Sequence, residues 1–105
     1  MVQVNSAGAV GVTFYDFRNL HRETVTLPTD YWSTFSIDHG ATFGADEAHV
    51  AGSFDMLTAP FAAGFFVGDY EGLATRGITF QPFFVQANSG NTANRTDVFA
   101  ATAAP

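Results

Sequence analysis

The sequence contains no cysteine and no lysine, and only 13% of its residues are charged. Without cysteine the chain forms no disulfide and offers no thiolate to a metal ion. Four arginines stand against ten acidic residues, which gives a formal net charge of −6. Nucleic-acid binding needs clustered cations, and Arg18 with Arg22 is the only close pair. We therefore expect no nucleic-acid partner.

Long hydrophobic runs and helical periodicity are also missing. The longest apolar run, around residues 61–67, is far shorter than a membrane span. The first residues lack a basic start followed by an apolar core, so the given sequence shows no signal peptide. The nearest approaches to a helical pattern, residues 44–52 and 56–64, are short and interrupted by Gly or Pro. We expect a soluble chain with no membrane partner.

Strand-forming residues are plentiful: 12 Phe, 3 Tyr and 1 Trp, with 10 Gly to make turns. The composition therefore predicts an all-β fold, and the length suits one domain or a piece of one. Pattern and turn residues predict a loop over 52–61 and strands over 2–4, 10–17, 30–37, 47–51, 65–74, 78–87 and 96–101. Pro82 falls inside one of these strands, and we expect it at a bulge or an unpaired position.

The two halves of the chain share one layout of short strand, turn, long apolar strand, polar loop and strand. Residues 12–15 of the first half correspond to residues 83–86 of the second. A repeated four-stranded antiparallel unit is typical of β-propeller blades. The predicted organisation is a complete four-stranded blade over 1–52, a connecting loop over 53–64, and three strands of the next blade over 65–105.

Residues 36–43 form the clearest turn signal in the chain. The Asp38 carboxylate can accept hydrogen bonds from backbone N–H groups a few residues on, and Gly40 can adopt the positive φ that reverses the chain. The Thr42 hydroxyl is expected to close the turn locally, and the Phe43 ring to pack against the sheet below. Asp38 is therefore interpreted as structural. The motif residues are Ser36, Asp38, Gly40, Thr42 and Phe43.

The spacing S-x-D-x-G-x-T-aromatic is that of the Asp box, a turn repeated in sialidases and related propeller proteins. Two further segments accompany it, residues 10–18 and 65–74, and residues 29–32 lead into it. Over nearly its whole length the chain resembles the C-terminal part of bacterial sialidase-like proteins with BNR repeats, of the exo-α-sialidase kind.

The resemblance implies an antiparallel β-propeller in which the Asp box joins the third and fourth strands of a blade, on the outer rim and away from the substrate face. It also implies a secreted or cell-surface parent protein that hydrolyses terminal sialic acid or related glycosides, without a cofactor. Sialidases use an arginine triad, a Tyr nucleophile paired with Glu, and an Asp acid/base. Two blades do not carry that set, so we expect the chain alone to be inactive.

In such propellers the substrate face is formed by the loops from second to third strands and by the segments that lead into the innermost strands. The candidate substrate-binding residues at these places are Asp16, Arg18, Asp69, Tyr70, Glu71 and Arg95. The Arg18 guanidinium could hold a carboxylate through two hydrogen bonds, or form a structural pair with Asp16 or Asp69. On a strand, Asp69 and Glu71 share a face and Tyr70 takes the other. Asp69 and Glu71 could together bind a polar ligand. Alternatively, Asp69 stabilises a turn and Glu71 is solvated.

The remaining polar and aromatic residues point to structure rather than chemistry. The three histidines have no spacing that suggests a metal triad, so no metal site is predicted. The aromatic residues expected in the core are Trp32, Phe65, Phe66, Phe83 and Phe84.

Two functional hypotheses follow. The first is a piece of a sialidase-like propeller that supplies structure and part of a substrate face. The second is a non-catalytic carbohydrate-binding or self-assembling β module. Its partners would be a glycan, the remaining blades of the parent, or a second copy at the strand edge left open by residues 96–101.

Overall fold

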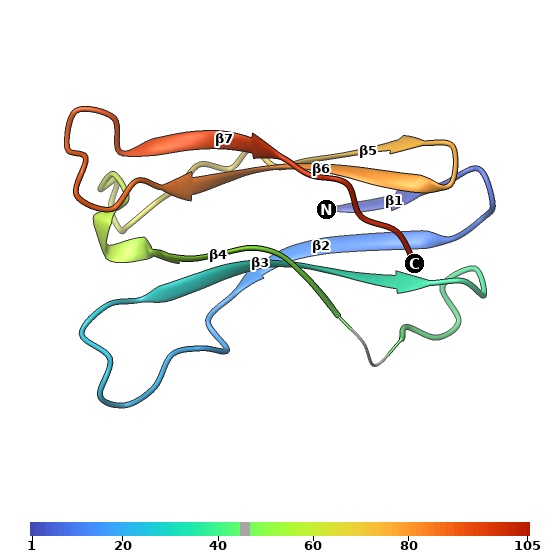
Figure 1. The fold of residues 1–105 in the computed structure, drawn as a ribbon, viewed down its shortest axis with the longest axis horizontal. Helices are drawn as coiled ribbons and strands as arrows, with labels where there is room; N and C mark the ends of the chain where they lie inside the picture. Colours follow the sequence, from blue (N-terminus) through green and yellow to red (C-terminus); the bar gives the residue numbers. More distant parts are fainter. Residues whose placement is uncertain (45–46) are drawn as a thin grey trace.

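The computed structural model describes residues 1–44 and 47–105, which form an all-β fold of two antiparallel sheets (Figure 1). The predicted all-β class and the grouping into four and three antiparallel strands are confirmed. A short 3₁₀ helix, η1 (Met56–Thr58), follows the first sheet. That sheet has the order β1 (Val2–Val4), β2 (Val10–Asp16), β3 (Pro28–Ser36) and β4 (Ala48–Asp55), and the second has β5 (Gly72–Arg76), β6 (Thr79–Ala87) and β7 (Thr96–Ala100).

The two sheets lie as two layers whose connections gather at opposite ends (Figure 1). The β1–β2, β3–β4 and β5–β6 connections lie at one end, on the right of the view. The β2–β3 and β6–β7 loops lie at the other end, together with η1. The Asp box of residues 36–43 is part of the β3–β4 connection. It is therefore at the opposite end of the molecule from the two loops that carry Arg18 and Arg95.

Two of the predicted strands differ from those observed. β4 continues to Asp55, where a loop was expected from residue 52, because Thr29 and Pro28 pair with Phe54 and Asp55. The strand expected over 65–74 is confined to its end, since β5 begins only at Gly72. Before it the chain folds back on itself through a Phe61–Phe65 bridge, and Gly68 takes a φ of 110°, which interrupts an extended course.

Pro82 lies inside β6, the central strand of the second sheet, opposite Leu73 of β5. Its carbonyl accepts a hydrogen bond from the Ala101 N–H at 3.1 Å. The amide nitrogen of a strand residue points to the same side as its carbonyl, so the missing N–H of Pro82 also faces Ala101. Because β7 ends at Ala100, the proline removes no hydrogen bond from the regular part of either ladder.

Aromatic rings from both sheets form the core between the layers. The Tyr31 ring stacks on Phe84 with centroids 4.5 Å apart and also contacts the Tyr15 ring at 4.7 Å. Further along, Phe35 lies 5.3 Å from Phe80. Gly11 is opposite Phe35 in the sheet, and a Cβ at this position would lie 2.7 Å from the Phe80 ring. The close approach of the layers therefore requires glycine here.

The Tyr15 hydroxyl also joins the two sheets through the backbone. It donates to the Val85 carbonyl at 2.7 Å and accepts from the Val85 N–H at 2.8 Å. β5 begins at Gly72, opposite Phe83, so it does not reach Val85. The phenol of the first sheet therefore satisfies two peptide groups that a longer β5 would have paired. Burial raises the pKa of Tyr15 to about 12, which keeps the phenol protonated as a donor at neutral pH.

Several aromatic residues expected in the core are exposed. Phe84 is buried as predicted, whereas the side chains of Phe65, Phe66 and Phe83 are 46%, 40% and 43% exposed to solvent. Phe65 and Phe66 precede β5 instead of lying in a strand, and Phe83 alternates with the buried Phe84 and so faces outward. Trp32 is half-buried on the outer face of the first sheet, in line with Phe14 and His49.

We predict that Tyr15→Phe lowers the free energy of unfolding by about 2 kcal/mol, because the ring stays while two partly buried peptide groups lose their partner. Urea unfolding followed by Trp32 fluorescence measures the change. Tyr70→Phe is the matched control, since Tyr70 is 88% exposed, and it should unfold like the wild type. Equal stability of the two variants would contradict the role given to Tyr15.

Candidate functional site

The Asp box is a closed hydrogen-bonded turn. Asp38 Oδ1 accepts from the Ser36 hydroxyl at 2.6 Å and from the Thr42 N–H at 2.8 Å, and Oδ2 accepts from the Thr42 hydroxyl at 2.6 Å. The Gly40 N–H donates to the Ser36 oxygen at 2.8 Å, and Gly40 has a φ of 89°. These hydrogen bonds hold the pKa of Asp38 well below its usual range. Three hydrogen bonds thus tie the Asp38 carboxylate to the turn.

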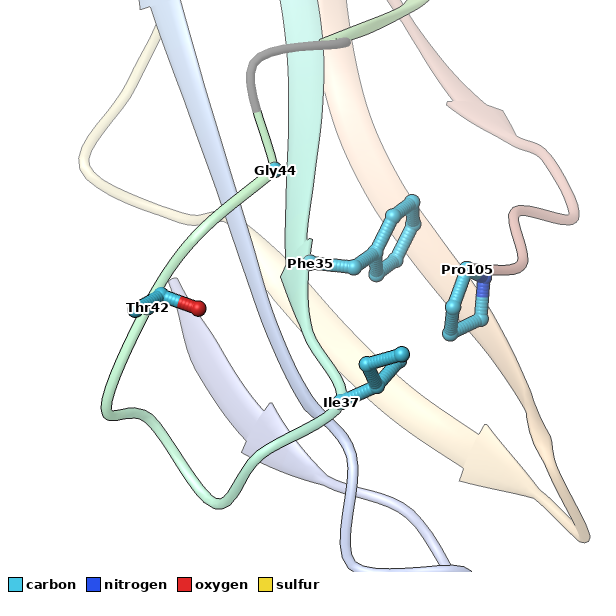
Figure 2. Close-up of a pocket in the computed structure, with 5 residues that line it drawn as sticks. All are labelled: Phe35, Ile37, Thr42, Gly44 and Pro105. Atoms are coloured by element: carbon cyan, nitrogen blue, oxygen red, sulfur yellow. The ribbon is translucent and has the colours of Figure 1, made fainter.

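The surroundings of this turn are apolar. Figure 2 shows Phe35, Ile37 and Pro105 directed towards a common space, with Thr42 and Gly44 on its other side. These residues line a cavity of about 250 Å³. The Phe43 ring does not pack below the turn as expected: it remains 44% exposed and is not among the residues that line the cavity. The described residues of its lining offer one hydroxyl and no charged side chain.

Arg18 lies on the outer face of the first sheet and is neutralised there. Its guanidinium forms ion pairs with Asp16 and, at 2.5 Å, with Glu47, and it lies 3.9 Å from the centre of the Trp32 ring. Arg18 therefore forms the structural ion pair with Asp16 that the sequence allowed as an alternative to substrate binding. Glu47 is a second partner, which the sequence did not indicate. A guanidinium held by two carboxylates and an aromatic ring is poorly available to a substrate carboxylate.

Asp30 forms a second polar cluster on this face, which the sequence did not reveal. It is 1% exposed and accepts hydrogen bonds from Asn19 at 2.9 Å and Ser53 at 2.8 Å, and His49 Nε2 lies 2.7 Å away. Burial acts to raise the pKa of Asp30, but these three partners outweigh it and lower the pKa. Ser53 contacts Asp30 and not His49, so the cluster is no Ser–His–Asp relay. One sequence feature could have indicated this cluster: Asp30 lies within an apolar strand, and a buried aspartate needs hydrogen-bond partners.

Glu71 pairs with a tyrosine, but with Tyr31 rather than its neighbour Tyr70. The Tyr31 hydroxyl lies 2.7 Å from Thr13 Oγ1 and 3.2 Å from Glu71 Oε2. Tyr31 has no exposed surface, and burial raises its pKa. A buried, protonated phenol is unsuited to nucleophilic attack. Asp69 and Tyr70 are exposed and lie outside any strand, so the expected alternation over residues 69–71 does not apply.

Arg95 lies in a third place, in the β6–β7 loop. Its Nη1 donates to the Thr58 carbonyl at 3.3 Å, and the side chain lines a cavity of about 240 Å³ between η1 and the loop. The six candidate residues thus do not form one site. Asp16 and Arg18 belong to the outer face, Glu71 to the Tyr31 network, and Arg95 to this cavity.

Neither a metal centre nor a membrane segment is recognisable in the part of the chain that the structure describes. Residues 1–44 and 47–105 contain no group of three or more His, Asp or Glu side chains arranged to hold a metal ion. None of their helices has the length and hydropathy needed to cross a bilayer. Comparison of the sequence and structure with models of known families, with curated proteins and with solved structures gives no match.

We predict that Asp38→Asn lowers the melting temperature at pH 7, because the amide nitrogen cannot accept the Thr42 hydroxyl. Since the pKa of folded Asp38 is lowered, its ionised form stabilises the fold above the unfolded pKa of about 4. That contribution is lost as the pH falls towards the folded pKa. The difference between wild type and Asp38→Asn should therefore be largest near neutral pH and shrink below about pH 4.

Thermal scans monitored by circular dichroism between pH 7 and pH 2.5 measure this difference. Asp69→Asn is the matched control, because Asp69 is exposed and has no hydrogen-bond partner among the described residues. A gap between wild type and Asp38→Asn that widens on acidification would contradict the interpretation.

Proposed function

We propose that this chain forms two adjoining blades of a sialidase-like Asp-box propeller whose parent hydrolyses terminal sialic acid or related glycosides. One observation carries the proposal. A hydrogen-bonded Asp-box turn joins the third and fourth strands of a four-stranded antiparallel sheet, and a second antiparallel sheet in sequential strand order packs against it. Sequential four-stranded sheets in face-to-face contact are the repeating units of propellers.

Within this proposal the chain contributes architecture and one end of a substrate face. The β2–β3 and β6–β7 loops lie at the end of the sheets away from the Asp box (Figure 1), which is the end that the resemblance assigns to substrate. The catalytic groups come from other parts of the parent. Arg18 is held by Asp16 and Glu47, and the only Tyr–Glu contact among the described residues has a buried phenol.

The purified chain should therefore release no fluorophore from a 4-methylumbelliferyl sialoside above the buffer rate. The assay must run with protein whose circular dichroism shows a folded β structure. Turnover that is lost in Glu71→Gln would overturn this part of the proposal, since it would mean that the chain holds a working catalytic set. Glu71→Gln is a suitable probe because the glutamine keeps the size of the side chain that contacts Tyr31.

A second candidate, a self-assembling module, rests on the open edge of the second sheet. β7 is the last strand of the order β5-β6-β7, and its side chains Val98 and Phe99 are 73% and 40% exposed. An edge strand with apolar side chains and unpaired backbone groups recruits another strand. The partner would be a second copy or a neighbouring blade of the parent.

We expect the isolated chain to sediment as a species larger than its 11.2 kDa mass at high protein concentration. Val98→Lys should shift it towards the monomer, because a lysine on an edge strand opposes strand addition. Val25→Lys is the matched control, as Val25 is 91% exposed in the β2–β3 connection, and it should leave the distribution unchanged. A wild-type monomer at all concentrations would exclude assembly through this edge.

A further inference from the structure

A polar cavity lies between η1 and the β6–β7 loop, at the end of the molecule opposite to the Asp box. Its volume is about 240 Å³, below the usual range for drug-sized ligands and suited to a single small ring. Leu57 and Thr58 of η1 form one side, and Asn88, Asn91 and Arg95 form the other.

The chain itself fixes which atoms the two asparagines present. The Asn88 Nδ2 group donates to the Asn94 carbonyl at 3.1 Å and to Asp97 Oδ2 at 2.7 Å, which leaves Oδ1 as an acceptor. Asn91 Oδ1 accepts from the N–H groups of Ala93 and Asn94 at 3.2 and 3.1 Å, which leaves its Nδ2 as a donor. Two lining residues of the cavity thus keep an amide acceptor, Asn88 Oδ1, and an amide donor, Asn91 Nδ2, that form no hydrogen bond with the described residues, on side chains held in place by the loop.

Arg95 and Leu57 complete the lining with two different kinds of contact. Arg95 uses one N–H for the Thr58 carbonyl, and its planar guanidinium has further donors. Leu57 is 41% exposed and offers an apolar surface. A ring that carries hydroxyls on its rim and C–H groups on its face matches this combination, because each hydroxyl both donates and accepts.

We propose that this cavity binds a neutral pyranose ring through two vicinal hydroxyls, with Arg95 and Asn91 as donors, Asn88 as acceptor and Leu57 beneath the ring. A carboxylated sugar is disfavoured. Asp97 lies beside the cavity, where hydrogen bonds from Asn88 and Asn94 hold it in position, and the chain carries a formal charge of −6. The site is therefore distinct from a sialic-acid subsite.

This inference goes beyond the proposed propeller function and stands on the cavity alone. It assigns no hydrolysis, and it holds or fails for a free chain whether or not the parent acts on sialosides. Its test uses binding as the readout, so its failure leaves the sialoside assay and the sedimentation experiment unaffected.

The test is a titration of the ¹⁵N-labelled 105-residue chain, followed by two-dimensional NMR. The probes are methyl α-D-mannopyranoside, methyl α-D-glucopyranoside, N-acetylneuraminic acid, and cyclohexanol as a ring with a single hydroxyl. We expect saturable shifts at the amides of Gly90, Asn91 and Thr92 with at least one neutral glycoside. Cyclohexanol and N-acetylneuraminic acid should bind at least about tenfold more weakly.

Arg95→Gln should weaken binding of the neutral glycoside at least about tenfold, since it removes charged donors. Arg22→Gln, which removes an exposed arginine outside the cavity, should leave the affinity unchanged. Shifts that map elsewhere, no saturable binding of either glycoside, equal affinity in Arg95→Gln, or tighter binding of N-acetylneuraminic acid would each overturn the proposal. The wild-type shift map decides the location even if Arg95→Gln does not fold.

Discussion

A single phenol joins the two sheets at the point where the second sheet lacks a neighbouring strand. β5 is too short to pair with the far part of β6, so the peptide of Val85 faces an edge without a neighbouring strand. Tyr15 reaches across from the first sheet and satisfies both the N–H and the carbonyl of Val85, which belong to two successive peptide groups. The same ring contacts Tyr31, which in turn stacks on Phe84. Loss of this contact would leave two partly buried polar groups without a partner. The Tyr15 side chain therefore joins the two sheets through both polar and aromatic contacts, beside the hydrogen bond from Asn5 Nδ2 to the Ile78 carbonyl at 2.7 Å.

Much of the fold could be predicted from local sequence signals. The turn chemistry of Asp38 and Gly40 predicted the β3–β4 connection, and the apolar, aromatic-rich runs of residues 10–17 and 78–87 predicted two of the strands. The predictions failed where a strand depends on distant partners. β4 extends through Gly52 to Asp55 because residues at the start of β3 pair with it, and no local pattern carries that information. The aromatic composition around Phe65 and Phe66 predicts a strand. The Phe61–Phe65 bridge and the positive φ of Gly68 instead fold the chain back before β5 begins.

The candidate site was less predictable than the fold for a physical reason. Sequence could nominate Arg18, Glu71 and Arg95 as groups capable of binding, but not the partners that decide their chemistry. Glu47, in the β3–β4 connection, forms an ion pair with Arg18 of the β2–β3 connection. Tyr31 contacts Glu71, which lies 40 positions later in the sequence. The buried Asp30 cluster was missed because Asn19, His49 and Ser53 come together only when β3 and β4 pair. Arg95, in contrast, lines a polar cavity whose asparagine amides are oriented by the chain itself.

Amide hydrogen exchange at Val85, measured by NMR on the native chain, tests most directly whether Tyr15 joins the sheets. Val85 and Val98 lie opposite each other in the β6–β7 ladder. Because the Val85 N–H points away from β7 towards Tyr15, the Val98 N–H likewise points away from β6, to the open edge. In dilute protein, where the β7 edge has no partner strand, we predict slow exchange at Val85 and fast exchange at Val98 in the same molecule. Fast exchange at both amides would show that the phenol does not protect the peptide, and would contradict the proposed joining of the two sheets.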